Sequence, residues 1–142
     1  MIAVGSDHGG FVLKQQILKY LDDNNIDYQD CGVFSEEKSD YPVIAKKVAD
    51  LVACKSCQKG LLFCGTGLGM CIAANKTKNI RAVCVTDSFS ATYSRLHNNA
   101  NILCLGGRVV GPGLAIQLVD IFLNTKFEAG RHQTRLDMLE HN

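Results

Sequence analysis

The chain has 142 residues, 46% of them hydrophobic and 20% charged, with a formal net charge of +1. This length and balance predict one compact soluble domain, residues 1-142. The near-neutral charge gives no electrostatic reason to expect nucleic acid or a membrane as a partner, and no apolar run approaches the roughly 20 residues of a membrane helix. The N-terminus has no basic segment ahead of its apolar residues, so we expect a cytoplasmic protein.

Short apolar runs alternate along the chain with segments of helical period. We expect strands at residues 1–6, 26–31, 61–63, 81–86 and 101–105. We expect helices at about 11–21, 42–52, 70–75, 88–96 and 113–123, and a short one at 130–141. The helix at 113–123 is apolar on more than one face, which predicts burial on two sides and makes a subunit interface plausible.

Five strands that alternate with helices predict an α/β, three-layer Rossmann-like fold with a five-stranded parallel sheet and helices on both faces. Ligands bind such sheets at the carboxyl ends of the strands, near a switch in strand order. This rule gathers the polar residues that follow the strands. They are Asp7 and His8, residues 64–69, Asp87, and residues 106–108.

The stretch from Gly60 to Asn75 is the main candidate for a site. A strand leads into the alternating glycines of Gly65-Thr66-Gly67-Leu68-Gly69, and a helix follows. A strand, a glycine loop and a helix N-terminus together form an anion cradle of backbone N–H groups. Cys64 stands at its lip, where the helix terminus favours the thiolate, so it is a candidate base or nucleophile. The alternative is a buried cysteine followed by a tight turn.

The same glycines allow a second interpretation, a dinucleotide site. The pattern GxGxG is one residue short of GxGxxG, and Asp87 lies about 20 residues further on, where a ribose-binding acid is expected. The motif follows the third strand and not the first, however, and 142 residues leave little room for a substrate domain.

Basic residues indicate a sugar-phosphate site instead. Arg131 and Arg135 are four residues apart and share a helix face, where two guanidinium groups suit a phosphate dianion. Arg108, after the fifth strand, is able to join them or to cap the strand edge. Ion pairs with Glu128 or Asp137 are the alternative for the two arginines of the tail.

Two histidines add to this interpretation. The Asp7-His8 pair lies on a strand-to-helix turn, where an anion or a hydroxyl group can be received. His97 closes the fourth helix, and a helix C-terminus stabilises a protonated imidazole. A solvated loop histidine and a C-terminal capping histidine are the corresponding structural alternatives.

Six blocks of the sequence, in this order, carry a resemblance. They are GSDHGGF at 5–11, DYP at 40–42, CGTGLG at 64–69, AANK at 73–76, SRLHN at 94–98 and GRHQTR at 130–135. Together they resemble the ribose-5-phosphate isomerase type B family, which is related to galactose-6-phosphate and allose-6-phosphate isomerases. The match extends over nearly the whole chain.

The resemblance implies an aldose–ketose isomerase that interconverts D-ribose 5-phosphate and D-ribulose 5-phosphate in the pentose phosphate pathway. The reaction would proceed by abstraction of the C2 proton through a cis-enediolate, with no metal and no organic cofactor. The alternatives are a six-carbon sugar phosphate, allose 6-phosphate or galactose 6-phosphate, as substrate, a dinucleotide-binding module, and a phosphosugar sensor without catalysis.

The resemblance also implies a role for each matching residue. Cys64 corresponds to the general base, His97 to the acid that opens the sugar ring, and Asp7 to a group near the ring oxygen. The loop Gly65, Thr66, Gly67, Leu68 and Gly69 corresponds to the enediolate site, with Thr66 among the catalytic residues. The remaining substrate contacts correspond to His8, Asn98, Arg108, Arg131 and Arg135.

Assembly follows from the resemblance as well. In the family the tail arginines serve a neighbouring subunit, so we expect a homodimer or a dimer of dimers whose C-terminal tail (about 124-142) reaches the next subunit. Some members carry Ser in place of Cys64 and use a carboxylate further along the loop. This chain has no acid between Gly65 and Lys76, so the cysteine version is the one that it resembles.

Overall fold

The computed structural model describes residues 1–141, which form a five-stranded sheet enclosed by helices. The strands are β1 (Ile2–Ser6), β2 (Tyr28–Asp30), β3 (Lys59–Cys64), β4 (Ala82–Cys84) and β5 (Ile102–Gly106). The helices are α1 (Phe11–Asp23), α2 (Tyr41–Ala53), α3 (Leu68–Ala74), α4 (Ser88–Leu96), α5 (Pro112–Asn124) and α6 (Arg131–Glu140), with a 3-10 turn, η1, at His8–Gly10. No helix within residues 1–141 is long and apolar enough to cross a bilayer.

The sheet is parallel throughout, with strand order β2-β1-β3-β5-β4. After β2 the chain returns to the other side of β1, so the order reverses between β1 and β3. Ser6 pairs with Phe63, and Cys64 pairs with Gly106. The carboxyl ends of the three central strands therefore meet at the switch point where open α/β sheets bind ligands.

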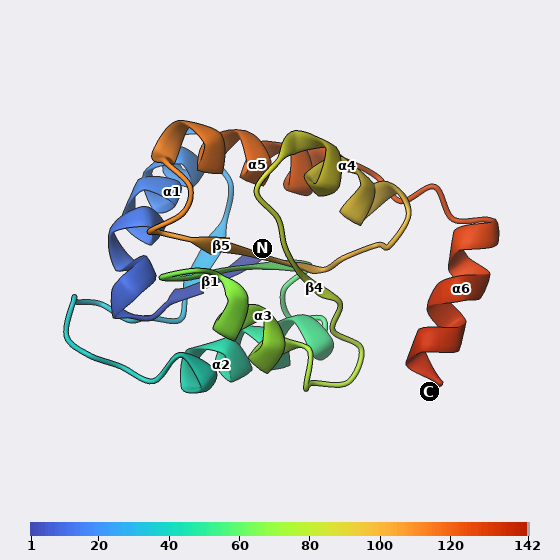
Figure 1. The fold of residues 1–142 in the computed structure, drawn as a ribbon, viewed down its shortest axis with the longest axis horizontal. Coiled ribbons are helices and arrows are strands. Elements are labelled where there is room, and N and C mark those ends of the chain that lie inside the picture. The colour runs from blue at the N-terminus through green and yellow to red at the C-terminus, as the bar shows by residue number, and fades with distance from the viewer. Residues whose placement is uncertain (142) are drawn as a thin grey trace.

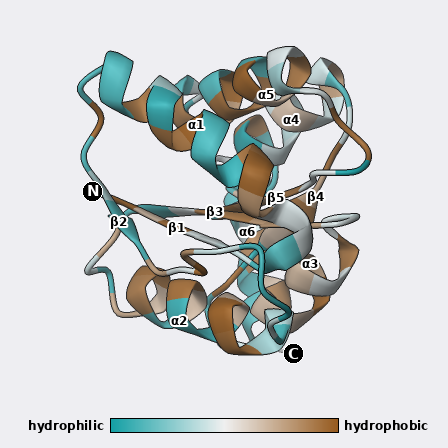
Figure 2. Ribbon diagram, turned by 90° about the vertical axis from the view of Figure 1, so that its left-hand side faces the viewer, coloured by the Kyte–Doolittle hydropathy of each residue, from teal (hydrophilic) through white to brown (hydrophobic). Residues whose placement is uncertain are grey.

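Two hydrophobic cores lie on the two faces of the sheet. Helices α1, α4 and α5 cover one face, and α2 and α3 cover the other (Figure 1). Along their length the helices of both layers alternate between hydrophilic and hydrophobic residues, as expected when one side of each helix is buried (Figure 2). The predicted three-layer α/β fold is confirmed.

The apolar faces of helix α5 are covered by neighbouring elements of the same chain. Its residues Leu118 and Phe122 are fully buried, and the helix packs against both α1 and α4 within the chain. The prediction of burial on two sides is confirmed. A subunit interface is not needed to account for it, because neighbouring helices of the same layer supply the cover.

The C-terminal helix α6 stands at one side of the molecule, beside the end that carries β4 (Figure 1). Its residues His132 and Leu136 are 5% and 4% exposed, so one face of the helix packs on its own chain. Arg81 Nη1 lies 2.6 Å from Glu140 Oε1 and fixes the last turn. Arg131 and Arg135 of the same helix are exposed.

Gly10 is required where α1 begins, because the chain there passes directly over β3. A Cβ on Gly10 would overlap the backbone carbonyl of Phe63, and backbone cannot move aside as a flexible side chain can. We expect Gly10→Ala to lower the free energy of unfolding by about 3 kcal/mol. Gly113→Ala is the matched control, since a Cβ there meets nothing within 4 Å. Urea unfolding of both variants measures the difference, and equal stabilities would contradict the predicted clash.

Candidate active site

Three strand-to-helix turns pack backbone against backbone at the switch point. A Cβ on Gly9 would lie 3.0 Å from the Gly65 nitrogen, and one on Gly107 would lie 2.8 Å from the Gly9 oxygen. The Gly107 N–H donates to the Cys64 carbonyl at 2.8 Å, and the Arg108 N–H donates to the Gly65 carbonyl at 3.0 Å. Glycine is needed at these points because side chains would force the turns apart.

Cys64 lies at the centre of this arrangement. It is the last residue of β3 and is 5% exposed. Its Sγ accepts a hydrogen bond from the Gly67 N–H at 3.0 Å. Gly67 adopts a positive φ of 80°, a conformation that glycine reaches at little cost, and this turn aims its N–H at the sulfur. The strand end and the loop together fix the position of the thiol.

The glycine loop differs in one respect from a cradle in which every N–H points outward. The Gly67 N–H is taken by Cys64, and the Leu68 N–H donates to Thr66 Oγ1 at 3.3 Å. Among the described residues, the N–H groups of Gly65, Thr66 and Gly69 have no acceptor. Some backbone N–H groups of the loop therefore bond within the loop and fix its shape, and others are available to a ligand.

Asp7 and His8 lie beside this loop, as predicted. Asp7 is 7% exposed, and its Oδ1 accepts from the Gly10 N–H at 3.1 Å. The His8 N–H donates to Ser39 Oγ, and the Ser39 N–H donates to His8 Nδ1, both at 3.2 Å. Because Nδ1 is an acceptor, the neutral imidazole carries its proton on Nε2 and is able to donate it to a ligand. No local pattern in the sequence points to Ser39, which is 31 residues away from His8.

Two further side chains cover the glycine loop. The Arg108 guanidinium lies over Gly65, with Nη1 at 2.9 Å from the position of a Cβ there. The Tyr41 ring lies over Gly69 in the same way, also at 2.9 Å. Arg108 is exposed and carries a positive charge to the loop. Tyr41 has no role in the sequence-based site, although it belongs to the Asp40-Tyr41-Pro42 block that supports the resemblance.

Cys71 is a second thiol near the loop. A hydrogen bond from Cys104 lowers the pKa of Cys71 to about 7, while burial raises that of Cys104 well above its usual value. The Cys71 Sγ lies 3.4 Å from the Ala82 carbonyl, so it faces β4. Cys71 is not among the candidate bases predicted from the sequence, and its environment makes it the natural control for Cys64.

His97 and Asn98 lie near the amino ends of the strands, whereas Cys64 lies at their carboxyl ends. Gly60 pairs with Ile102 and Cys64 with Gly106, so about 13 Å of strand separates these two ends of the sheet. His97 ends α4, which runs back toward the amino end of the sheet. A single chain therefore does not bring His97 to Cys64. The predicted catalytic residues lie at opposite ends of the strands.

His97 has close neighbours that are not among the site residues predicted from the sequence. Its ring stacks on that of His132, with centroids 4.0 Å apart and planes 15° apart. Tyr93 contacts its other side in an edge-to-face arrangement with centroids 4.7 Å apart. Glu128 Oε2 lies 3.7 Å from His97 Nε2 and 3.5 Å from His132 Nε2. Burial, followed by the charge of His97, lowers the pKa of His132.

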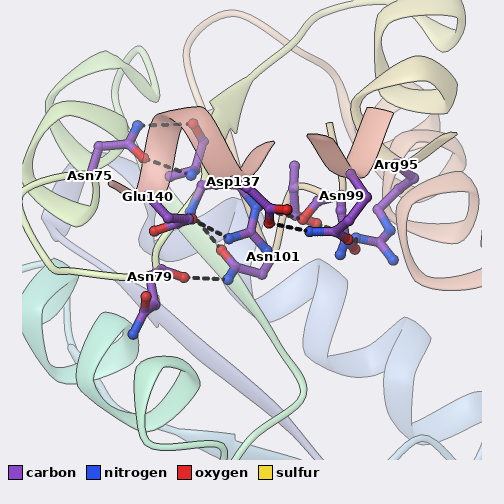
Figure 3. A network of polar contacts seen from close by, with 11 residues as sticks. Asn75, Asn79, Arg95, Asn99, Asn101, Asp137 and Glu140 are labelled. Carbon is purple, nitrogen blue, oxygen red and sulfur yellow. Dashed lines mark hydrogen bonds and ion pairs between the residues drawn. The ribbon is translucent and has the colours of Figure 1, made fainter. Parts of the chain in front are cut away.

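A polar network supports this amino-terminal edge (Figure 3). Arg95 Nη1 donates to Asn99 Oδ1 at 2.9 Å, which holds the turn that follows His97 and Asn98. Asn101 Nδ2 donates to the Asn79 carbonyl at 2.9 Å. The network positions the segment that carries His97, and it contains none of the groups found around Cys64.

Asp87 is engaged in a structural role. Its Oδ1 accepts from the Ser90 N–H at 2.7 Å at the start of α4, and this bond lowers the pKa of the carboxyl group. A capping carboxylate explains this residue without a ribose, so the local geometry gives the dinucleotide interpretation no support.

The fold and the site define a small Rossmann-like α/β protein that holds a thiol, a carboxylate, a histidine and an arginine at its switch point. Residues 2–139 match the family model described as Ribose/Galactose Isomerase. The chain belongs to this family.

Named relatives agree with the family model. The chain is 46% identical over 138 residues to ribose-5-phosphate isomerase B of Escherichia coli, covering 97% of this chain and 93% of that protein. Its identity to ribose-5-P isomerase B of Listeria innocua is 45% over 139 residues, covering 98% and 94%.

Solved structures share the whole fold. Ribose-5-phosphate isomerase B of Clostridium thermocellum superposes with a TM-score of 0.97 at 46% identity, covering 99% of this chain and 95% of that one. The Mycoplasma genitalium enzyme, with bound ribulose-5-phosphate, gives a TM-score of 0.93 at 42% identity, covering 99% and 93%.

Proposed function

We propose that this protein interconverts D-ribose 5-phosphate and D-ribulose 5-phosphate, a reaction of the pentose phosphate pathway. The observation that carries the proposal is the environment of Cys64. Its thiol is fixed by Gly67, lies between turns that contribute Asp7 and Arg108, and is followed by backbone N–H groups that have no acceptor within residues 1–141. Membership in the ribose/galactose isomerase family points to the same chemistry.

In the proposed reaction, Cys64 removes the proton from C2 of the open-chain sugar. Negative charge then develops on the carbonyl oxygen as the enediolate forms. The N–H groups of Gly65, Thr66 and Gly69 are suited to receive that oxygen, because preformed donors stabilise developing charge with little reorganisation. Return of the proton to C1, together with transfer of the O2 hydroxyl proton to O1, completes the isomerisation without any change in atoms or oxidation state overall.

The phosphate group is assigned to the cationic side chains. Arg108 and the Nε2–H of His8 belong to the same chain as Cys64. Arg131 and Arg135 lie on the outer face of α6, where a second chain is able to use them. Phosphate binding away from the reacting carbons positions those carbons against the base.

The remaining groups require a second subunit. We infer a homodimer in which His97 and Asn98 of one chain complete the site around Cys64 of the other, because one chain leaves them at opposite edges of the sheet. Exposed apolar side chains support an interface next to the edge strand β4. They are Leu68 and Ile72 on α3, Phe89 on α4, and Met138 and Leu139 on α6.

Proton NMR of ribose 5-phosphate with the protein in heavy water tests the proposal. We expect ribulose 5-phosphate to appear together with exchange of the C2 proton for deuterium. Binding with neither product nor exchange would indicate a sensor, and turnover only of allose 6-phosphate or galactose 6-phosphate would indicate a six-carbon substrate. Absence of both product and exchange with every sugar phosphate would refute the proposed isomerase.

A further inference from the structure

Three potential metal ligands converge where α6 meets the end of α4. Among the described residues, His97, Glu128 and His132 form a group whose ligand atoms all lie within 4.8 Å of one another. Two imidazoles and one carboxylate are a common protein ligand set for zinc, with a fourth position left open. The reaction proposed above requires no metal, so that reaction does not explain why these three ligands converge.

His132 is the most informative member of the group. It is 5% exposed, and its Nε2 has no hydrogen-bond partner among the described residues. A buried polar atom without a partner costs about 1–3 kcal/mol. The atom faces Glu128 Oε2 at 3.5 Å, which is too long for a hydrogen bond. No hydrogen bond therefore offsets the free-energy cost of burying this nitrogen.

The spacing fits a metal ion better than it fits direct hydrogen bonds. Two ligand atoms at about 2.0–2.1 Å from a tetrahedral zinc ion are about 3.3 Å apart. Glu128 Oε2 lies 3.5 Å from His132 Nε2 and 3.7 Å from His97 Nε2. The ligand atoms of the three residues all lie within 4.8 Å of one another. Because the two imidazole planes are stacked at 15°, one ring would have to turn out of the stack for both Nε2 lone pairs to meet one ion, and His97 is the more exposed of the two.

The backbone next to Glu128 is held in an unusual conformation. Ala129 has a φ of 61°, in the left-handed region, which costs a residue with a Cβ roughly 1–2 kcal/mol. The Glu128 N–H donates to the Leu96 carbonyl at 3.1 Å, and the His132 N–H donates to the Ala129 carbonyl at 3.2 Å. This tight turn brings the carboxylate back over His132 and against the end of α4.

We propose that His97, Glu128 and His132 bind a divalent transition-metal ion of the zinc type, and that the bound ion inhibits the isomerase. Imidazole ligands select such ions over magnesium or calcium. Inhibition rests on the proposed function, because the metal would occupy the Nε2 of the residue assigned as the acid for ring opening. Metal binding itself does not depend on that function.

Cobalt spectroscopy tests the site without reference to activity. We expect Co²⁺ to bind with one ion per chain and to give the visible absorption of a low-coordinate site, and Zn²⁺ to abolish it. A nitrogen and oxygen ligand set gives no thiolate charge-transfer band, which distinguishes this site from the free cysteines. His132→Gln and Glu128→Gln should each weaken binding by about tenfold or more. His141→Gln is the matched control, because His141 is exposed and outside the group.

Each outcome decides one part of the proposal. Equal cobalt binding by the wild type and both site variants would overturn the metal site, as would a spectrum dominated by thiolate ligands. Because Glu128 is 46% exposed at its side chain, its variant remains informative if His132→Gln fails to fold. Zinc inhibition is measured against each variant's own metal-free rate and reversed with EDTA. Cobalt binding with no inhibition would overturn the inhibitory role and leave the metal site established.

Discussion

Replacement of Cys64 by alanine is expected to lower kcat for ribose 5-phosphate by about 10²–10⁴-fold, the usual contribution of a positioned general base. The substrate should still bind, because Arg108 and His8 are unaffected, so KM should change little. Steady-state kinetics and binding of ribose 5-phosphate by calorimetry measure the two effects separately.

Two controls separate base chemistry from structure. Cys64→Ser keeps a group that can accept from the Gly67 N–H, so it should fold normally and yet lose most of its turnover, since a hydroxyl group is a far weaker acid than a thiol. Cys71→Ala removes another thiol near the loop, whose pKa is about 7, and should retain full turnover. Loss of activity in Cys71→Ala with retention in Cys64→Ala would exchange the roles of the two residues.

The fold follows closely from sequence periodicity, and its two largest discrepancies have a common cause. The strands predicted at 26–31 and 81–86 are observed only as β2 (Tyr28–Asp30) and β4 (Ala82–Cys84). Both are edge strands, so each pairs on one side only and its ladder ends early. Apolar patterning indicates which residues are buried, but pairing on both sides is what extends a strand.

The switch-point residues could be predicted because parallel strands bring their carboxyl ends together. Asp7, His8, Cys64 and Arg108 all lie where that rule places them. Contacts that depend on tertiary packing gave no such signal. Ser39 binds His8 from a loop 31 residues away, and no pattern in the sequence shows that the Gly67 N–H points at the sulfur and not at a ligand.

The position of His97 could have been predicted from the sequence. The alternation of strands and helices implies that the C-terminus of a helix lies near the amino ends of the strands, away from Cys64. The resemblance assigned the tail arginines to a neighbouring subunit but did not state which chain contributes His97. The sheet register shows that Cys64 lies at the carboxyl ends of the strands, away from the end of α4, and the homodimer proposed above would bring the two groups together.

This division predicts complementation between two inactive chains. Cys64→Ala and His97→Gln homodimers should each have low turnover. A purified heterodimer of the two should regain about half of the wild-type kcat per dimer, because one of its two sites combines an intact Cys64 with an intact His97. Chains that carry different affinity tags allow the heterodimer to be isolated and assayed directly.

The reciprocal heterodimer is the control. When both substitutions are on one chain and the partner is wild type, a shared site leaves each of the two sites with one defect, and turnover should stay low. A site contained within one chain gives the opposite pattern, with half activity in the reciprocal heterodimer and none in the first. The two heterodimers contain the same substitutions in the same number, so folding and tag effects cancel, and only the arrangement of Cys64 and His97 across the interface distinguishes them.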